Sequence, residues 1–173
     1  MFRFIIGKIA GEGFNTRLLP IKTLLACAFR QKILRNNPRV PWPVHATSKV
    51  SAPRKIDRGT RFPGLSQGSH IDGRNGILFG KNVWIGPHVS IISMNHDPNE
   101  FTRYLPADPV RIGDNCWIGA HAVILPSVVL GEHTIVAAGA VVTKAFPQGN
   151  QILAGVPARP VKSLPDYGSG PAI

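Results

Sequence analysis

The residues best suited to chemistry stand in the segment SMNHDP at positions 93–98, which contains His96. An imidazole has a pKa near neutrality, so one well-placed histidine can remove the proton from a hydroxyl group that is about to act as a nucleophile. We therefore predict that His96 is the general base of an enzyme. Asn95 and Asp97 could orient its ring or bind the acceptor, and a turn role for Asn-His-Asp-Pro explains them equally well.

A six-residue period surrounds this segment. From residue 112 an aliphatic side chain recurs at every sixth position, at Ile112, Ile118, Ile124, Leu130, Val136 and Val142. A six-residue unit is one short strand plus a turn and cannot bury its apolar face alone, so stacked units close a solenoid core. With three units per coil, residues eighteen apart lie above one another at the strand-stacking distance of about 4.8 Å.

The same period occurs earlier, in one block with Phe79, Ile85 and Ile91 and in another with Val50, Ile56 and Phe62. The register slips between these blocks, and residues 63–78, rich in Gly, Ser and Asp, are predicted to be an irregular connection. Residues 95–109 also break the period. The gap from Ile91 to Ile112 equals one repeat plus a fifteen-residue excursion, so this loop can leave one corner and return in phase. A long loop on a rigid scaffold is a usual place for function.

The N-terminal third has a different character. Residues 21–35 place Leu24, Leu25, Ala28, Phe29 and Ile33 at spacings of three and four with cations between them, which predicts a basic amphipathic helix. This helix could lie on an anionic membrane, but we favour a helix packed on the domain or on a neighbouring subunit.

The chain is accordingly divided into four parts. A helical, basic segment covers 1–43, the repeats cover 44–147, a C-terminal segment covers 148–164, and a loose tail covers 165–173. The best apolar run is too short and too interrupted for a transmembrane helix, and the N-terminus is not a convincing signal peptide.

Composition limits the partners. A formal charge of +11 predicts an anionic partner, which could be nucleic acid, a membrane surface or a phosphorylated small molecule. The basic region contains no recognised nucleic-acid module or aromatic platform, so we expect no nucleic acid. Cys27 and Cys116 are expected to be free thiols in a reducing cytoplasm. Residues 21–35 are a candidate contact for the inner face of the membrane.

From about residue 44 to residue 164 the chain resembles the hexapeptide-repeat acyltransferases. The most specific parts are SMNHDP at 93–98, IGDNCWIGAHAVILPSVVLGEHTIVAAGAVVTKAFP at 112–147 and AGVPARPVK at 154–162. The likeness is greatest to the sugar and polysaccharide O-acetyltransferases with Asn-His-Asp at the start of the loop. This resemblance implies an all-β fold, a left-handed parallel β-helix solenoid, and a homotrimer with active sites between subunits. It also implies acetyl-CoA as the donor and a hydroxyl-bearing saccharide as the acceptor.

The resemblance also suggests site residues. His96 matches the catalytic histidine of the family, and Trp117 lies along the pantetheine or acceptor tunnel. The residues implied to bind the donor are Ala138, Thr143 and Lys144 along CoA, and Arg159 and Lys162 near its phosphates. Ala120, where relatives often carry a hydroxyl, is a candidate main-chain donor to the developing oxyanion. Ala145 and Pro160 depart from the usual acidic and aliphatic residues.

Two other functions stay open at this point. If the excursion preserves phase, His88 and His121 occupy equivalent positions on adjacent coils, and γ-class carbonic anhydrases use the same fold with a three-histidine zinc site. His133 falls on another face, so we expect no metal and a polar surface pair of histidines or a subunit contact. The remaining alternative is a non-catalytic, membrane-docked assembly protein. In that case the basic helix has the functional role and His96 has none.

Overall fold

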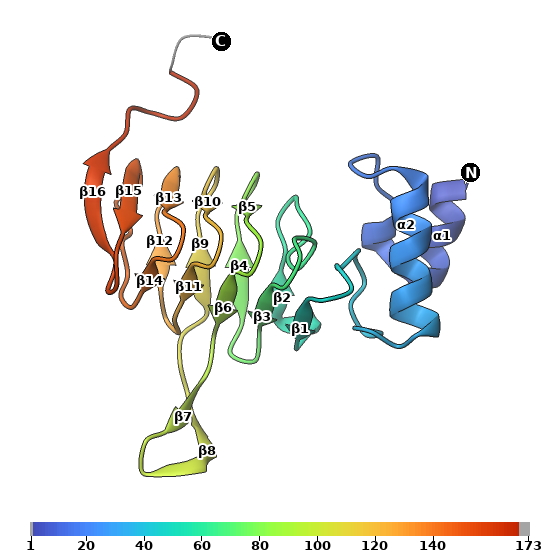
Figure 1. Ribbon diagram of the computed structural model, residues 1–173, viewed down its shortest axis with the longest axis horizontal. Helices are drawn as coiled ribbons and strands as arrows, with labels where there is room; N and C mark the ends of the chain where they lie inside the picture. The colour runs from blue at the N-terminus through green and yellow to red at the C-terminus, as the bar shows by residue number, and fades with distance from the viewer. Residues whose placement is uncertain (1, 170–173) are drawn as a thin grey trace.

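The computed structural model describes residues 2–169, and most of them form a three-sided prism of short parallel strands (Figure 1). Face A contains β1 (Lys49–Ser51), β3 (His70–Asp72), β6 (Ser90–Ile92), β11 (Val123–Ile124) and β14 (Val141–Val142). Face B contains β2 (Ile56–Asp57), β4 (Ile77–Phe79), β9 (Val110–Ile112) and β12 (Val129–Leu130). Face C contains β5 (Trp84–Ile85), β10 (Trp117–Ile118), β13 (Thr134–Val136), β15 (Gln151–Ala154) and the antiparallel β16 (Arg159–Ser163).

The pairing register confirms the coil length predicted from the period. Ile124 pairs with Val142, eighteen residues on, and Ile118 pairs with Val136. Across the excursion Ile118 pairs with Ile85, thirty-three residues back, which is one coil plus the fifteen inserted residues. The loop therefore returns to the solenoid in phase, as the spacing predicts.

The predicted irregular connection at 63–78 is wrong in part. β3 and the start of β4 lie within it, and Ile71 and Ile77 are fully buried in the solenoid core. Val50 pairs with Ile71 twenty-one residues on, so the turns in this coil hold more residues than those of later coils. Longer turns break the six-residue pattern in the sequence without breaking the stack of strands.

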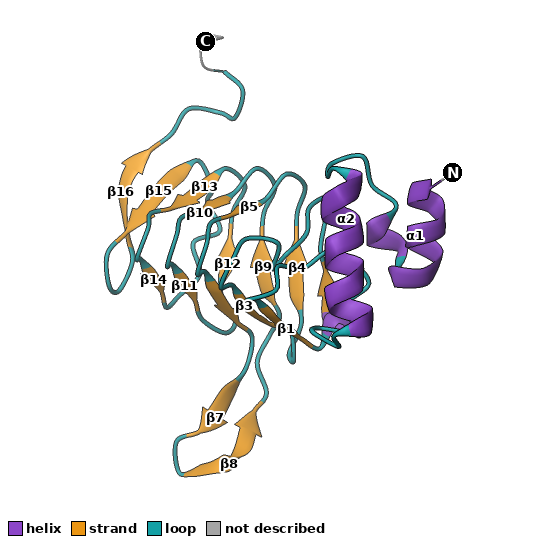
Figure 2. Cartoon of the chain, turned by 45° about the vertical axis from the view of Figure 1, so that its right-hand side comes forward, coloured by secondary structure: helices purple, strands orange, loops and turns teal. Residues whose placement is uncertain are grey.

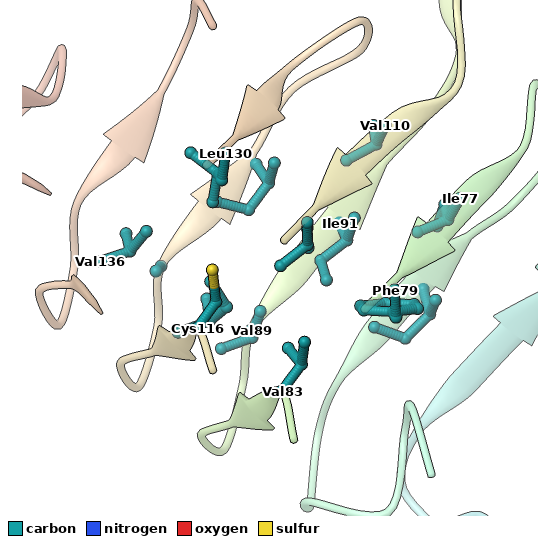
Figure 3. Close-up of a cluster of buried hydrophobic side chains, with 14 of the residues drawn as sticks. Ile77, Phe79, Val83, Val89, Ile91, Val110, Cys116, Leu130 and Val136 are labelled. Atoms are coloured by element: carbon teal, nitrogen blue, oxygen red, sulfur yellow. The ribbon is translucent and has the colours of Figure 1, made fainter. Parts of the chain in front are cut away.

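The period-six aliphatic side chains fill the interior. All six from Ile112 to Val142 are buried, and Figure 3 shows Ile77, Ile91, Cys116 and Leu130 projecting into the same core. Burial raises the pKa of the Cys116 thiol to about 11, so this cysteine stays a neutral, packed thiol at pH 7. Both cysteines are free, as predicted, and both are buried.

The corners of the solenoid require left-handed backbone angles and close contact between neighbouring coils. Asn82, Asn115, His133 and Asn150 occupy equivalent positions between faces B and C, all with φ between 44° and 57°. Asparagine tolerates this left-handed region better than most residues because its short polar side chain bonds locally. At Gly119 an added Cβ would lie 2.6 Å from the backbone nitrogen of Ala138, so only glycine lets these two coils stack.

A helical unit lies at one end of the solenoid (Figure 1). It contains α1 (Phe2–Ala10), the 3₁₀ turn η1 (Glu12–Phe14), α2 (Ile21–Ala28) and the π-helical η2 (Phe29–Ile33), and a further 3₁₀ turn η3 (Pro53–Lys55) follows β1. The helix predicted at 21–35 is confirmed as α2 and η2, whereas α1 was not predicted. No helix in residues 2–169 is both long and apolar enough to cross a bilayer.

The helical unit has its own small core and is tied to the solenoid through a glutamine. Leu24 and Cys27 of α2 pack with Phe14 and with residues of α1. The buried side chain of Gln31 donates to the carbonyl of Trp42 at 3.0 Å and accepts from the backbone N–H of Val44 at 2.8 Å. The unit therefore sits on the first coil through polar contacts as well as packing.

Candidate active site

The excursion is an antiparallel hairpin of β7 (Asn95–Asp97) and β8 (Glu100–Leu105). It leaves the solenoid after β6 on face A and returns at β9 on face B, so it projects from the edge between these two faces (Figure 2). Every side chain of β8 is exposed. The sequence prediction of a protruding loop at 95–109 is therefore confirmed, and the loop has regular structure.

His96 is exposed on β7, and its ring is held by a main-chain contact. Its Nδ1 hydrogen-bonds to the carbonyl oxygen of Phe101. A carbonyl only accepts, so in the neutral imidazole Nδ1 carries the proton and Nε2 presents a lone pair. Among residues 2–169 no hydrogen bond engages Nε2. This tautomer is the one that a general base needs.

Residues of the solenoid and of β8 support the ring. Tyr104 lies across from His96 with the ring centroids 4.6 Å apart, and the Arg74 guanidinium lies 4.9 Å from the Tyr104 centroid. Arg74 is in turn anchored by the buried carboxylate of Asp72 at 2.7 Å. Burial alone would raise the pKa of Asp72, but hydrogen bonds from Arg74 outweigh it and hold that pKa below its usual value. Asp72 is therefore charged at neutral pH and fixes Arg74.

The neighbours of His96 do not touch its ring. Asp97 Oδ1 accepts from the backbone N–H of Asn99 at 2.8 Å, which is the turn role, and exposed Asn95 pairs with Leu105 across the hairpin. The Phe101 carbonyl, rather than either side chain, orients His96 in this structure.

A second group of predicted residues lies on face C. Trp117 is 55% exposed on β10 and is the strand-pairing partner of Trp84 of β5, which is 54% exposed. Both indoles line a groove of about 380 Å³ together with Asn82, Asn115, His133, Ile135 and Tyr167. The sequence reading missed Trp84, although it stands thirty-three residues before Trp117, the spacing that also separates Ile85 from Ile118.

The C-terminal tail forms part of the wall of this groove. The Asn82 amide donates to the Tyr167 hydroxyl at 3.1 Å, the Tyr167 ring meets His133 edge-on at 5.0 Å, and the Asn150 amide donates to Asp166 at 2.9 Å. The predicted loose tail therefore has defined contacts up to residue 169. Residues 170–173 of that prediction lie outside the described residues.

The other predicted donor-binding residues occupy three places. Ala120 and Ala138 adjoin at the edge between faces C and A, where the Gly139 N–H donates to the Ala120 carbonyl at 2.8 Å. Exposed Thr143 and Lys144 follow β14 at the edge between faces A and B. The remaining two, Arg159 and Lys162, are exposed on β16 at the end of face C.

These places are not brought together within one chain. The edge between faces A and B, which carries His96, lies opposite face C, which carries Trp117, because the solenoid is three-sided. Within one chain, the hairpin that carries His96 and the groove beside Trp117 therefore lie on different sides of the prism.

Two of the histidines outside the hairpin form a pair. His88 and His121 stack with ring centroids 4.8 Å apart and an interplanar angle of 8°, as their predicted equivalence requires. His133 lies at another edge, where it bonds to the Asn150 side chain at 3.0 Å. Within residues 2–169, no cluster contains three His, Cys, Asp or Glu side chains placed to hold one metal ion.

Comparison with known proteins agrees with this architecture. The family model described as bacterial transferase hexapeptide (six repeats) matches residues 109–144. The galactoside O-acetyltransferase of Escherichia coli is 37% identical over 93 residues, covering 52% of this chain and 45% of that protein. The chain spans about half the length of the curated relatives that it matches.

Two solved structures extend the comparison. A galactoside acetyltransferase in complex with coenzyme A is 27% identical with a TM-score of 0.50, covering 69% of this chain and 64% of that one. A hexapeptide-repeat acetyltransferase of Vibrio cholerae is 23% identical with a TM-score of 0.51, covering 95% and 91%. The fold is the left-handed parallel β-helix that the sequence predicts.

Proposed function

We propose that this chain, which belongs to the hexapeptide-repeat transferase family, moves the acetyl group of acetyl-CoA to a hydroxyl of a sugar or polysaccharide precursor with His96 as the general base. The observation that carries the proposal is the hydrogen bond between His96 Nδ1 and the Phe101 carbonyl. It leaves Nε2 unprotonated and exposed on the longest excursion from the repeats.

The chemistry needs no acyl-enzyme, because a thioester is already activated. Nε2 of His96 takes the proton as the acceptor oxygen attacks the thioester carbonyl, and a tetrahedral intermediate forms. Its collapse breaks the carbon–sulfur bond, and the protonated histidine returns the proton to the departing CoA thiolate. Main-chain N–H groups of the coils near Ala120 would stabilise the oxyanion.

The donor is proposed to lie along face C and its edge with face A. Ala138 and Ala120 are small there and leave room for a pantetheine arm, while Arg159 and Lys162 on β16 offer cations to its phosphates. Lys144 lies on the edge between faces A and B, so it would reach the phosphates from the neighbouring subunit. The CoA complex of the galactoside acetyltransferase, at 27% identity, supports CoA as the ligand.

The active site is proposed to form between two subunits of a homotrimer. This follows from the opposite placement of His96 and Trp117 on the prism. In a closed ring of three chains, each hairpin would reach face C of its neighbour, and three equivalent sites would result.

A saccharide acceptor suits the groove on face C. The indole of Trp117, and the face of Trp84 that the Arg61 guanidinium does not cover, offer flat apolar surfaces to the C–H face of a sugar. The Asn115 amide N–H groups offer donors to its hydroxyls, whereas the Asn82 carboxamide is already bonded within the protein. Free Cys27 and Cys116 fit a cytoplasmic reaction.

The test is release of CoA from acetyl-CoA by the purified full chain, measured with a thiol reagent over a panel of neutral mono- and oligosaccharides. We expect at least one saccharide to stimulate release and to gain one acetyl ester by mass spectrometry. Amino sugars are the matched comparison. Release with amino sugars alone would assign an N-acetyltransferase and overturn the hydroxyl acceptor, and release with no saccharide would overturn the sugar.

A further inference from the structure

The helical unit presents an apolar surface that nothing in the described chain covers. Nine of the seventeen exposed large apolar or aromatic side chains of residues 2–169 fall between positions 4 and 34: Phe4, Ile5, Ile9, Leu18, Ile21, Leu25, Phe29, Ile33 and Leu34. All other described residues, from the solenoid, the hairpin and the tail, contribute only the remaining eight. Such a concentration marks an interaction surface rather than chance exposure.

The structure corrects which residues of α2 make this surface. Leu24, predicted on the apolar face, is fully buried against the core of the helical unit, with Cys27 and Gln31 on the same side. Ile21, Leu25, Phe29 and Ile33 recur at intervals of four and form the exposed stripe that runs along α2 and η2. Exposed Phe4, Ile5 and Ile9 add a second apolar group on α1.

Cations surround these side chains. Of the twenty Lys and Arg in the chain, eleven lie in residues 1–55, where Glu12 is the only acidic residue. Lys8, Arg17, Lys22, Arg30 and Arg35 are exposed. Their carbon stems can lie along an apolar layer while the charges reach outward.

This combination favours a lipid surface over a protein or nucleic-acid partner. A homo-oligomer would bring Lys22 and Arg30 of several copies together, and like charges repel, whereas the core of a protein interface is depleted in charge. Nucleic acid would use the cations and leave the apolar stripe exposed. Only an anionic bilayer satisfies both features, with apolar side chains in the acyl boundary and cations among the headgroups.

We propose that the helical unit docks on anionic phospholipid bilayers through Ile21, Leu25, Phe29 and Ile33 of α2 and η2, the apolar group on α1 and the surrounding cations. The chain lies on the bilayer without spanning it. Docking on lipid is independent of acetyl transfer, because lipid binding can be measured whether or not the chain transfers an acetyl group.

The test is flotation of the full chain with vesicles of phosphatidylcholine, alone or mixed with phosphatidylglycerol. We expect binding to the mixed vesicles and much weaker binding to phosphatidylcholine alone. The double variant Lys22→Gln/Arg30→Gln should bind the mixed vesicles roughly tenfold or more weakly, because each basic residue contributes near an anionic surface. The matched control, Lys81→Gln/Arg111→Gln, removes two exposed cations from the solenoid and should bind like the wild type.

Apolar variants separate lipid docking from subunit contact. Leu25→Ser/Phe29→Ser should lose flotation and keep its oligomeric mass. Loss of the oligomer in Leu25→Ser/Phe29→Ser would assign the stripe to subunit contact and overturn the proposal. Equal flotation of wild type and both double variants, or absence of wild-type flotation, would overturn it as well.

Discussion

Replacing His96 by alanine is expected to lower kcat by about 10²–10⁴-fold with the saccharide that the wild type acetylates. The proton of the acceptor hydroxyl then has no base within reach, because the hairpin offers no second imidazole. The side chain is exposed and bonded only to the Phe101 carbonyl, so its removal leaves the core intact. Steady-state CoA release measures kcat, and calorimetry measures the dissociation constant of acetyl-CoA, which should stay at its wild-type value.

The matched control is His45→Ala. His45 is a partly exposed histidine near the start of the solenoid that bonds to Thr47, and it has no part in the proposed site. It should leave kcat at the wild-type level. A His96→Ala protein that binds acetyl-CoA and turns over at the wild-type rate would remove His96 from the mechanism.

Two inactive chains are expected to restore activity when they assemble together. In the first chain His96→Ala removes the base, and in the second Trp117→Glu places a carboxylate in the groove of face C. If each site combines the hairpin of one chain with face C of the next, about one site in four of a random mixture has both parts intact. Co-expression with two tags, followed by CoA release on the mixed oligomers, gives the measured fraction.

A mixture of wild type with the double variant His96→Ala/Trp117→Glu distinguishes the two geometries again. A site between chains leaves about a quarter of wild-type activity in that equal mixture, whereas a site within one chain leaves about half. If the first mixture stays inactive and the second retains half, each chain builds its own site and the opposite placement of His96 and Trp117 must be relieved by movement of the hairpin.

The repeats could be predicted because the buried positions of the solenoid require apolar residues at a fixed spacing in the sequence. Each coil buries one aliphatic side chain per strand, so Ile112 to Val142 report coil length, phase and the in-phase return of the excursion. The first coils were less readable, since their turns are longer and shift the buried positions of Ile71 and Ile77 out of the six-residue pattern. The six-residue period in the sequence depends on the length of the turns, whereas the stacking of the coils depends only on the pairing of the strands.

Of the candidate site, only the residues that stand in recognisable sequence motifs could be predicted. His96 stands out in the sequence, but its orientation comes from the carbonyl of Phe101, and main-chain partners leave no trace in residue identity. Arg74 is brought to Tyr104 by the fold across thirty residues. Trp84 is different, because the length of the excursion is enough to predict that it pairs with Trp117 on the next coil.

Binding of acetyl-CoA to the purified wild-type chain can be measured by isothermal titration calorimetry. We expect saturable binding with one acetyl-CoA per chain, weakened by salt because cations such as Lys144 and Arg159 would contact the phosphates. Absence of binding by the folded protein at low salt would contradict the acetyltransferase reading at its first step, whatever the acceptor.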